Sequence, residues 1–104
     1  MQEPSVAQMH QTIDQTLERL KSASETLERY AHDFLLPYEQ RHDCDLTAAL
    51  SDHAIGVLTS LHTFIDTRGV LEHDYALLNS VDLTANKFEI MIRAIENIKK
   101  SRMN

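Results

Sequence analysis

Apolar side chains recur every three, four or seven residues along most of the chain, which is the spacing of one face of an α-helix. The first such segment predicts a helix over residues 5–36, a rod of roughly 45 Å at 1.5 Å per residue. Ser5 is its expected N-cap, and Pro37 forces an end near Leu35 or Leu36. The apolar face of this helix consists of Val6, Met9, Ile13, Leu17, Leu20, Leu27, Ala31 and Phe34.

A second helix is predicted over residues 45–68. The preceding segment, residues 38–44, is polar and charged and is expected to be a loop that contains Cys44. Asp45 is the expected N-cap, and Gly69 follows the last helical residue. Gly56 lies inside the helix, where it either allows a close helix crossing or is tolerated at a cost of about 1 kcal/mol. The apolar face consists of Leu46, Leu50, Ala54, Val57, Leu58, Leu61, Phe64 and Ile65.

The third predicted helix covers residues 70–100, with Asn79-Ser80 as a candidate interruption, and it is apolar on two sides. Its main face consists of Leu77, Val81, Phe88, Met91, Ile92, Ile95 and Ile98. A second set projects to another side and consists of Ala76, Leu83, Ile90 and Ala94. A helix that is apolar on two sides must be covered on two sides. Either a partner covers the second set, with Leu83, Ile90 and Ala94 in the contact, or the first helix wraps around the third.

The connections between these helices are short, so successive helices are expected to be antiparallel. The predicted fold is all-α: one domain over residues 1–104, an up-down-up three-helix bundle completed by dimerisation. Composition agrees, because a chain with only two glycines and two prolines has few turns. Its 42% hydrophobic and 25% charged residues are typical of ordinary globular domains.

Charge and targeting signals narrow the classes of partner. The formal net charge is −6, which disfavours nonspecific binding to nucleic acid, although residues 87–104 hold five basic and two acidic residues. No apolar run approaches the length of a membrane span, so no membrane partner is expected. The first ten residues lack the features of a secretory signal, and one cysteine fits a reducing compartment. We therefore expect a cytoplasmic protein.

Six histidines raise the question of a metal site. Two ligands on one helix face need a spacing of four residues, and His62 with Asp66 is the pair that we single out. Two ligands are too few for a structural zinc or a di-iron site, so we expect solvated histidines, no metal and no cofactor. Cys44 has acidic neighbours, which raise the pKa of a thiol and disfavour nucleophilic chemistry.

One motif points to a specific chemistry. Arg68, His73 and Tyr75 have the spacing R-x4-H-x-Y, followed by a long amphipathic helix. This resembles the signature of the HEPN superfamily of helical ribonucleases, especially the HepT-like toxins of toxin–antitoxin systems. The resemblance implies proton transfer by His73, phosphorane stabilisation by Arg68, and modification of Tyr75 by a partner nucleotidyltransferase, in a site at a dimer interface. The alternative interpretation is a helix-terminal arginine followed by a turn and a capping His-Asp pair.

Two functions follow from these patterns. The favoured hypothesis is a non-enzymatic, acidic protein-interaction module, similar in profile to secretion chaperones, immunity or antitoxin proteins and phage-type inhibitors. It would bind a helical partner, or a second copy of itself, through apolar helix faces. The alternative is a HEPN-like, metal-independent RNA endonuclease toxin or a degenerate relative, whose partner is RNA.

Overall fold

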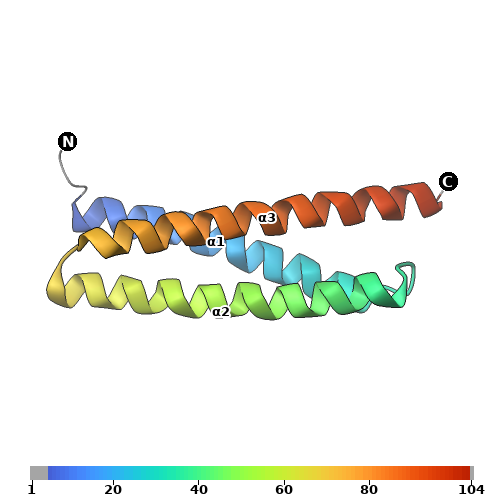
Figure 1. Cartoon of the computed structure of the whole chain (residues 1–104), viewed down its shortest axis with the longest axis horizontal. Coiled ribbons are helices and arrows are strands. Elements are labelled where there is room, and N and C mark those ends of the chain that lie inside the picture. Colours follow the sequence, from blue (N-terminus) through green and yellow to red (C-terminus); the bar gives the residue numbers. More distant parts are fainter. Residues whose placement is uncertain (1–4, 104) are drawn as a thin grey trace.

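The computed structural model describes residues 5–103 and consists of three long helices in antiparallel succession. They are α1 (Val6–Ala31), α2 (Tyr38–Arg68) and α3 (Glu72–Met103). α1 runs obliquely behind the other two, from the beginning of α3 to the beginning of α2 (Figure 1). The all-α three-helix bundle predicted from the sequence is confirmed. Residues 1–4, part of the segment searched for a secretory signal, lie outside the described residues.

The bundle is elongated. Its principal extents are 52 × 23 × 16 Å and its radius of gyration is 16.2 Å, whereas a compact domain of this length has about 13 Å. The accessible surface is 6990 Å², and size scaling for a compact monomer of this mass gives about 6,000 Å². The chain thus leaves more surface in water than a compact fold of its size.

Both ends of α1 follow from local hydrogen bonds. Ser5 forms a capping box with Gln8: its Oγ accepts the Gln8 N–H at 3.2 Å, and its own N–H donates to Gln8 Oε1 at 2.9 Å. The predicted N-cap is confirmed, but the helix ends at Ala31 rather than near Leu35. The Asp33 carboxylate accepts the Leu35 N–H at 2.9 Å and so forms a turn before Pro37. Phe34, predicted in the core, is therefore 86% exposed.

The predicted loop over residues 38–44 is wrong, because α2 already begins at Tyr38. Pro37 takes the N-cap position of α2, where its missing N–H costs nothing. Cys44 is fully buried and lies on the same helical face as Ala48 and Ser51, four and seven residues later. Burial of that one face stabilises the helical turn although its other residues are polar.

The buried face of α2 is also rotated relative to the prediction. Leu46, Leu50 and Phe64 belong to the predicted apolar face, but each is more than half exposed. α1 packs most extensively against α2, whereas α2 and α3 pack against each other least. The face of α2 that turns toward α1 is therefore the one that is buried. Its buried residues are Cys44, Ala48, Ser51, Leu58, Leu61 and Ile65.

α3 continues without interruption through Asn79-Ser80, so the predicted break there is wrong. The turn before it depends on Gly69, whose φ of +78° is a conformation that favours glycine. Gly56, by contrast, is exposed, and a Cβ built there meets no atom within 4 Å. Gly56 therefore marks no close helix crossing. Among the described residues, no helix is long and apolar enough to cross a membrane.

Candidate functional site

The second apolar set of α3 is exposed to solvent. Leu83 and Ile90 are 62% and 60% exposed, and Ala94 is exposed beside them. Leu83 and Ile90 lie seven residues apart, so they occupy the same face of the helix. We call Leu83, Ile90 and Ala94 the α3 stripe. The described part of the chain does not cover this face. The alternative in which the first helix wraps around the third to cover it is therefore wrong.

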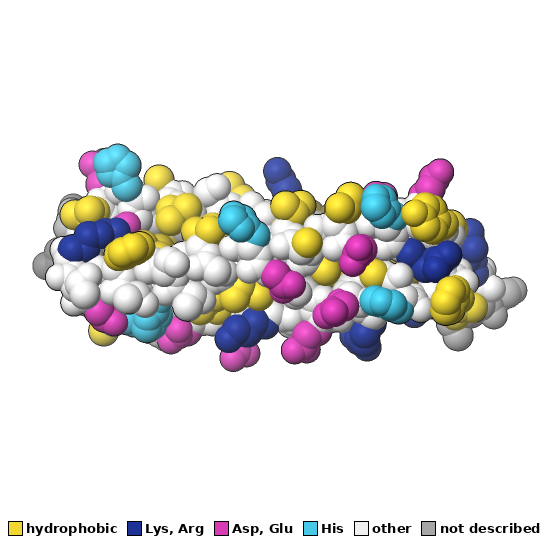
Figure 2. Space-filling view, turned by 90° about the horizontal axis from the view of Figure 1, so that it is seen from below, with side chains coloured by type: hydrophobic (Ala, Val, Ile, Leu, Met, Phe, Trp, Pro, Cys, Tyr) yellow, Lys and Arg dark blue, Asp and Glu magenta, His cyan; other side chains and the backbone are white. Residues whose placement is uncertain are grey.

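A second exposed stripe runs along α2. Leu50, the half-buried Val57 and Phe64 follow each other at intervals of seven residues, and Leu46 extends the row by one turn. We call these four residues the α2 stripe. Seen from the side of α2, hydrophobic side chains are spread along the length of the molecule between charged and histidine side chains (Figure 2). These four residues belong to the apolar face that the sequence predicts for this helix, and the structure leaves that part of the face in solvent.

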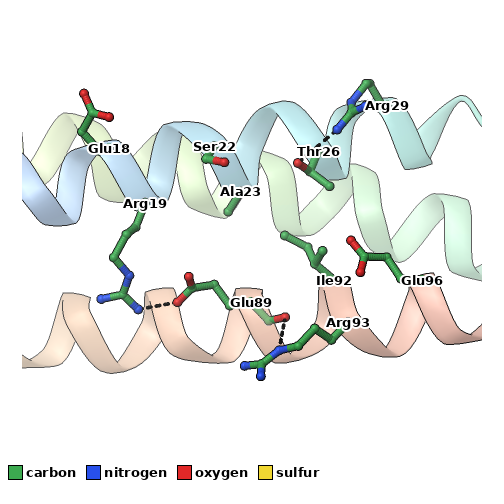
Figure 3. A pocket seen from close by; sticks show the side chains of 10 residues that line it. All are labelled: Glu18, Arg19, Ser22, Ala23, Thr26, Arg29, Glu89, Ile92, Arg93 and Glu96. Atoms are coloured by element: carbon green, nitrogen blue, oxygen red, sulfur yellow. Dashed lines mark hydrogen bonds and ion pairs between the residues drawn. The ribbon is translucent and has the colours of Figure 1, made fainter.

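The groove between α1 and α3 is lined by charged side chains together with Ala23 and Ile92, and ion pairs cross it. Arg19 of α1 reaches across to α3 and binds Asp82, Asn86 and Glu89. Figure 3 shows Arg19 pointing toward Glu89 from the opposite helix. The hydrogen bond with Glu89 raises the pKa of Arg19, which therefore stays charged. Arg19 thus pairs with two carboxylates of α3, and these contacts serve the packing of α3 on α1.

The three residues of the R-x4-H-x-Y motif lie on both sides of the turn between α2 and α3. Arg68 ends α2, and its guanidinium binds the carboxylate of Asp74 through two hydrogen bonds of 2.9 Å. His73 is exposed in the first turn of α3, and Tyr75 is half-buried. The ribonuclease assignment of these residues remains a prediction.

Cys44 lies in the core rather than in a loop. Burial, with a smaller contribution from Asp43, raises the pKa of its thiol to about 11. The thiol is therefore protonated at neutral pH. A buried, protonated thiol is a poor nucleophile.

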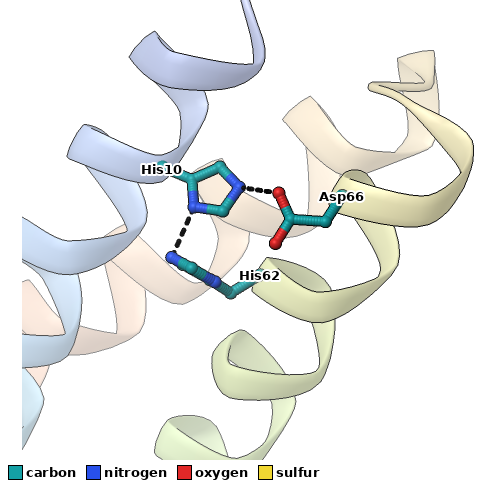
Figure 4. A group of neighbouring side chains, drawn as sticks. All are labelled: His10, His62 and Asp66. Atoms are coloured by element: carbon teal, nitrogen blue, oxygen red, sulfur yellow. Dashed lines mark hydrogen bonds and ion pairs between the residues drawn. The ribbon is translucent and has the colours of Figure 1, made fainter.

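A cluster of histidine and aspartate side chains joins the beginning of α1 to the end of α2 (Figure 4). His10 Nδ1 and His62 Nε2 lie 2.5 Å apart, and the two rings meet edge to face. His10 Nε2 lies 2.8 Å from Asp66 Oδ1. His62 Nε2 lies 3.7 Å from Asp14 Oδ1.

Sequence reasoning found half of this cluster. It singled out His62 and Asp66 on the second helix but missed His10 and Asp14, which have the same spacing of four residues on the first helix. The signal was present as two His-x3-Asp pairs on helices expected to be antiparallel neighbours. Their register, which brings one pair opposite the other, depends on how α1 and α2 pack.

Comparison with family models, curated proteins and solved structures yields no match to this chain.

Proposed function

We propose that this chain is a small acidic protein-interaction module. Its α2 stripe and α3 stripe bind an amphipathic helix, supplied by a second copy of the chain or by another protein. The observation that carries the proposal is the exposure of large apolar side chains at intervals of seven residues on two neighbouring helices. Helices with apolar residues at that interval pack side by side along a continuous seam.

The surface area of the chain supports the same conclusion. The exposed area exceeds that of a compact monomer by roughly 1,000 Å², as estimated from the size scaling. Interfaces between stable partners bury about 800 Å² on each side. A helix laid along the stripes would remove surface of this order from water.

Charge selects among partners. The net charge of −6 attracts a basic partner and speeds its association. The same charge makes two copies of the chain repel each other. This repulsion is reduced if the segment 87–104, which is rich in lysine and arginine, lies against acidic segments of the second copy. Association with a basic partner is therefore expected to weaken at high salt, whereas salt screens the repulsion between two copies of the chain.

Sedimentation of the whole chain over a wide concentration range tests the proposal. We expect a dimer that dissociates in the Leu83→Glu/Ile90→Glu variant, because two charges are placed in the apolar seam. Gln15→Glu, at an exposed position of α1, is the control and should associate like the wild type. A strict monomer at millimolar concentration that also binds no amphipathic helix and no hydrophobic dye would overturn the proposal.

A further inference from the structure

We propose that His10, His62 and Asp66 form a binding site for a divalent transition-metal ion between α1 and α2, and that Zn²⁺ is the ion whose size and ligand preference suit it best. Asp14 lies next to His62 at this site. The inference concerns the described side chains at one end of the bundle and does not depend on the partner proposed above.

The approach of the two rings carries the inference. His10 Nδ1 and His62 Nε2 face each other at 2.5 Å. Two ring nitrogens can face each other this closely when one carries a hydrogen and donates it to the other, or when a metal ion binds both lone pairs.

The carboxylates beside the rings favour the metal ion. Asp66 Oδ1 lies 2.8 Å from His10 Nε2, which is buried and has no hydrogen-bond partner among the described side chains. A buried ring nitrogen that lies beside a carboxylate without a hydrogen bond is suited to bind a cation. Asp14 adds a further anionic oxygen, 3.7 Å from His62 Nε2.

The dimensions suit a small ion. The candidate ligand atoms of His10, His62 and Asp66 all lie within 4.8 Å of one another. Ligands at about 2.0–2.1 Å from a tetrahedral zinc are roughly 3.3 Å apart. The observed separations of 2.5 Å between His10 and His62 and 2.8 Å between His10 and Asp66 are shorter than this, so small rotations that move the side chains apart bring the three ligands into place.

The ligand types select the metal. Imidazole with carboxylate favours Zn²⁺ and its neighbours Co²⁺, Ni²⁺ and Cu²⁺ over Mg²⁺ and Ca²⁺, which prefer oxygen ligands only. Three protein ligands leave a fourth position for water. Because the ligands come from two helices, a bound ion ties the beginning of α1 to the end of α2.

Titration of the full chain with Zn²⁺ and Co²⁺ tests this site, with Mg²⁺ as the negative control. We expect one ion bound per chain, a visible absorption band of four-coordinate Co²⁺, and a saturable rise in Tm with Zn²⁺. Binding should release protons and weaken as the pH decreases from 7.5 to 5.5, because protons compete for the same nitrogens.

Three substitutions identify the ligands. His10→Gln, His62→Gln and Asp66→Asn should each abolish the one-to-one binding, because each removes one of the three ligands. His53→Gln, at an exposed histidine of the same helix as His62, is the matched control and should bind like the wild type. Circular dichroism verifies that each variant is folded.

Two results would overturn the proposal. One is Zn²⁺ affinity of the wild type no greater than that of folded His10→Gln, which would leave only a proton shared between the rings. The other is equal loss of binding in His53→Gln, which would indicate scattered surface histidines rather than this site.

Discussion

Arg68 and Asp74 join the end of α2 to the beginning of α3 through two parallel hydrogen bonds of 2.9 Å. Asp74 is almost fully buried, and its Oδ2 also accepts the Leu71 N–H at 2.7 Å. The same arginine donates to the carbonyl of Gly69. One ion pair thus holds both sides of the turn that begins at Gly69.

Asp74→Asn is expected to lower the free energy of unfolding at pH 7 by about 1–2 kcal/mol, because it removes a charge-assisted pair. The hydrogen bonds from Arg68, more than that from Leu71, hold the pKa of Asp74 below its usual value. A carboxyl group with a lower pKa in the folded than in the unfolded chain stabilises the fold above about pH 4–5. This contribution is lost as the pH falls through the folded-state pKa.

Urea unfolding of wild type and Asp74→Asn between pH 7 and pH 3 measures the contribution of the Asp74 carboxylate to the free energy of unfolding. The difference in unfolding free energy should be constant from pH 7 to 5 and then shrink as the pH falls. Asp45→Asn, at an exposed position of α2, is the control and should show no comparable loss. A difference that does not change with pH would contradict the role of the carboxylate charge.

Substitution of the two glycines by alanine is expected to change the stability of the fold in opposite directions. Gly56→Ala is expected to stabilise the fold by about 1 kcal/mol, because the position is helical, exposed and free of contacts. Gly69→Ala should destabilise it by about 1–2 kcal/mol, because φ at this residue is +78°. Thermal unfolding of the two variants side by side measures both effects. Stabilisation by both substitutions would contradict the geometry of the turn.

Leu58 and Leu50 of α2 allow the buried core and the exposed α2 stripe to be compared. Leu58 is fully buried and Leu50 is 60% exposed. Leu58→Ala should cost about 2–5 kcal/mol, because it leaves a cavity, whereas Leu50→Ala should change stability by less than about 0.5 kcal/mol. Urea unfolding at a concentration where the chain is monomeric gives both values. Equal costs would mean that Leu50 is buried in the monomer.

The ribonuclease hypothesis makes a separate prediction. Metal-independent cleavage of RNA should disappear in His73→Ala, while the unfolding free energy stays within about 0.5 kcal/mol of the wild type because His73 is exposed. Arg68→Ala should also abolish cleavage, but it breaks the pair with Asp74 and so affects stability as well. Incubation of labelled RNA with a chelator present measures the activity. RNA left intact by the wild type after prolonged incubation would remove the hypothesis.

The prediction of helical segments was most reliable where the local chemistry was unambiguous. Ser5 and Gln8 form a complete capping box, and Gly69 with its positive φ ends α2 where expected. The prediction failed over residues 38–44, because a polar turn becomes helical when a single residue, Cys44, reaches the core. It failed also at Asn79-Ser80, where two polar residues lie on the solvent side of a continuous helix.

The α2 stripe shows why the core was harder to predict than the helices. Leu46, Leu50 and Phe64 are as apolar as Leu58 and Ile65, and a broad apolar face does not reveal which part of it meets another helix. The three-dimensional position of α1 decides that α2 buries the part around Leu58.

Periodicity, helix caps and short connections act over a few residues, and they were sufficient to predict the number of helices, their antiparallel order and the surplus of apolar surface on α3. In contrast, the packed bundle was needed to show which apolar face of α2 stays in water and that His10 meets His62, 52 residues away in the chain. Both depend on the rotation and register of α1 against α2, and packing between distant segments sets these.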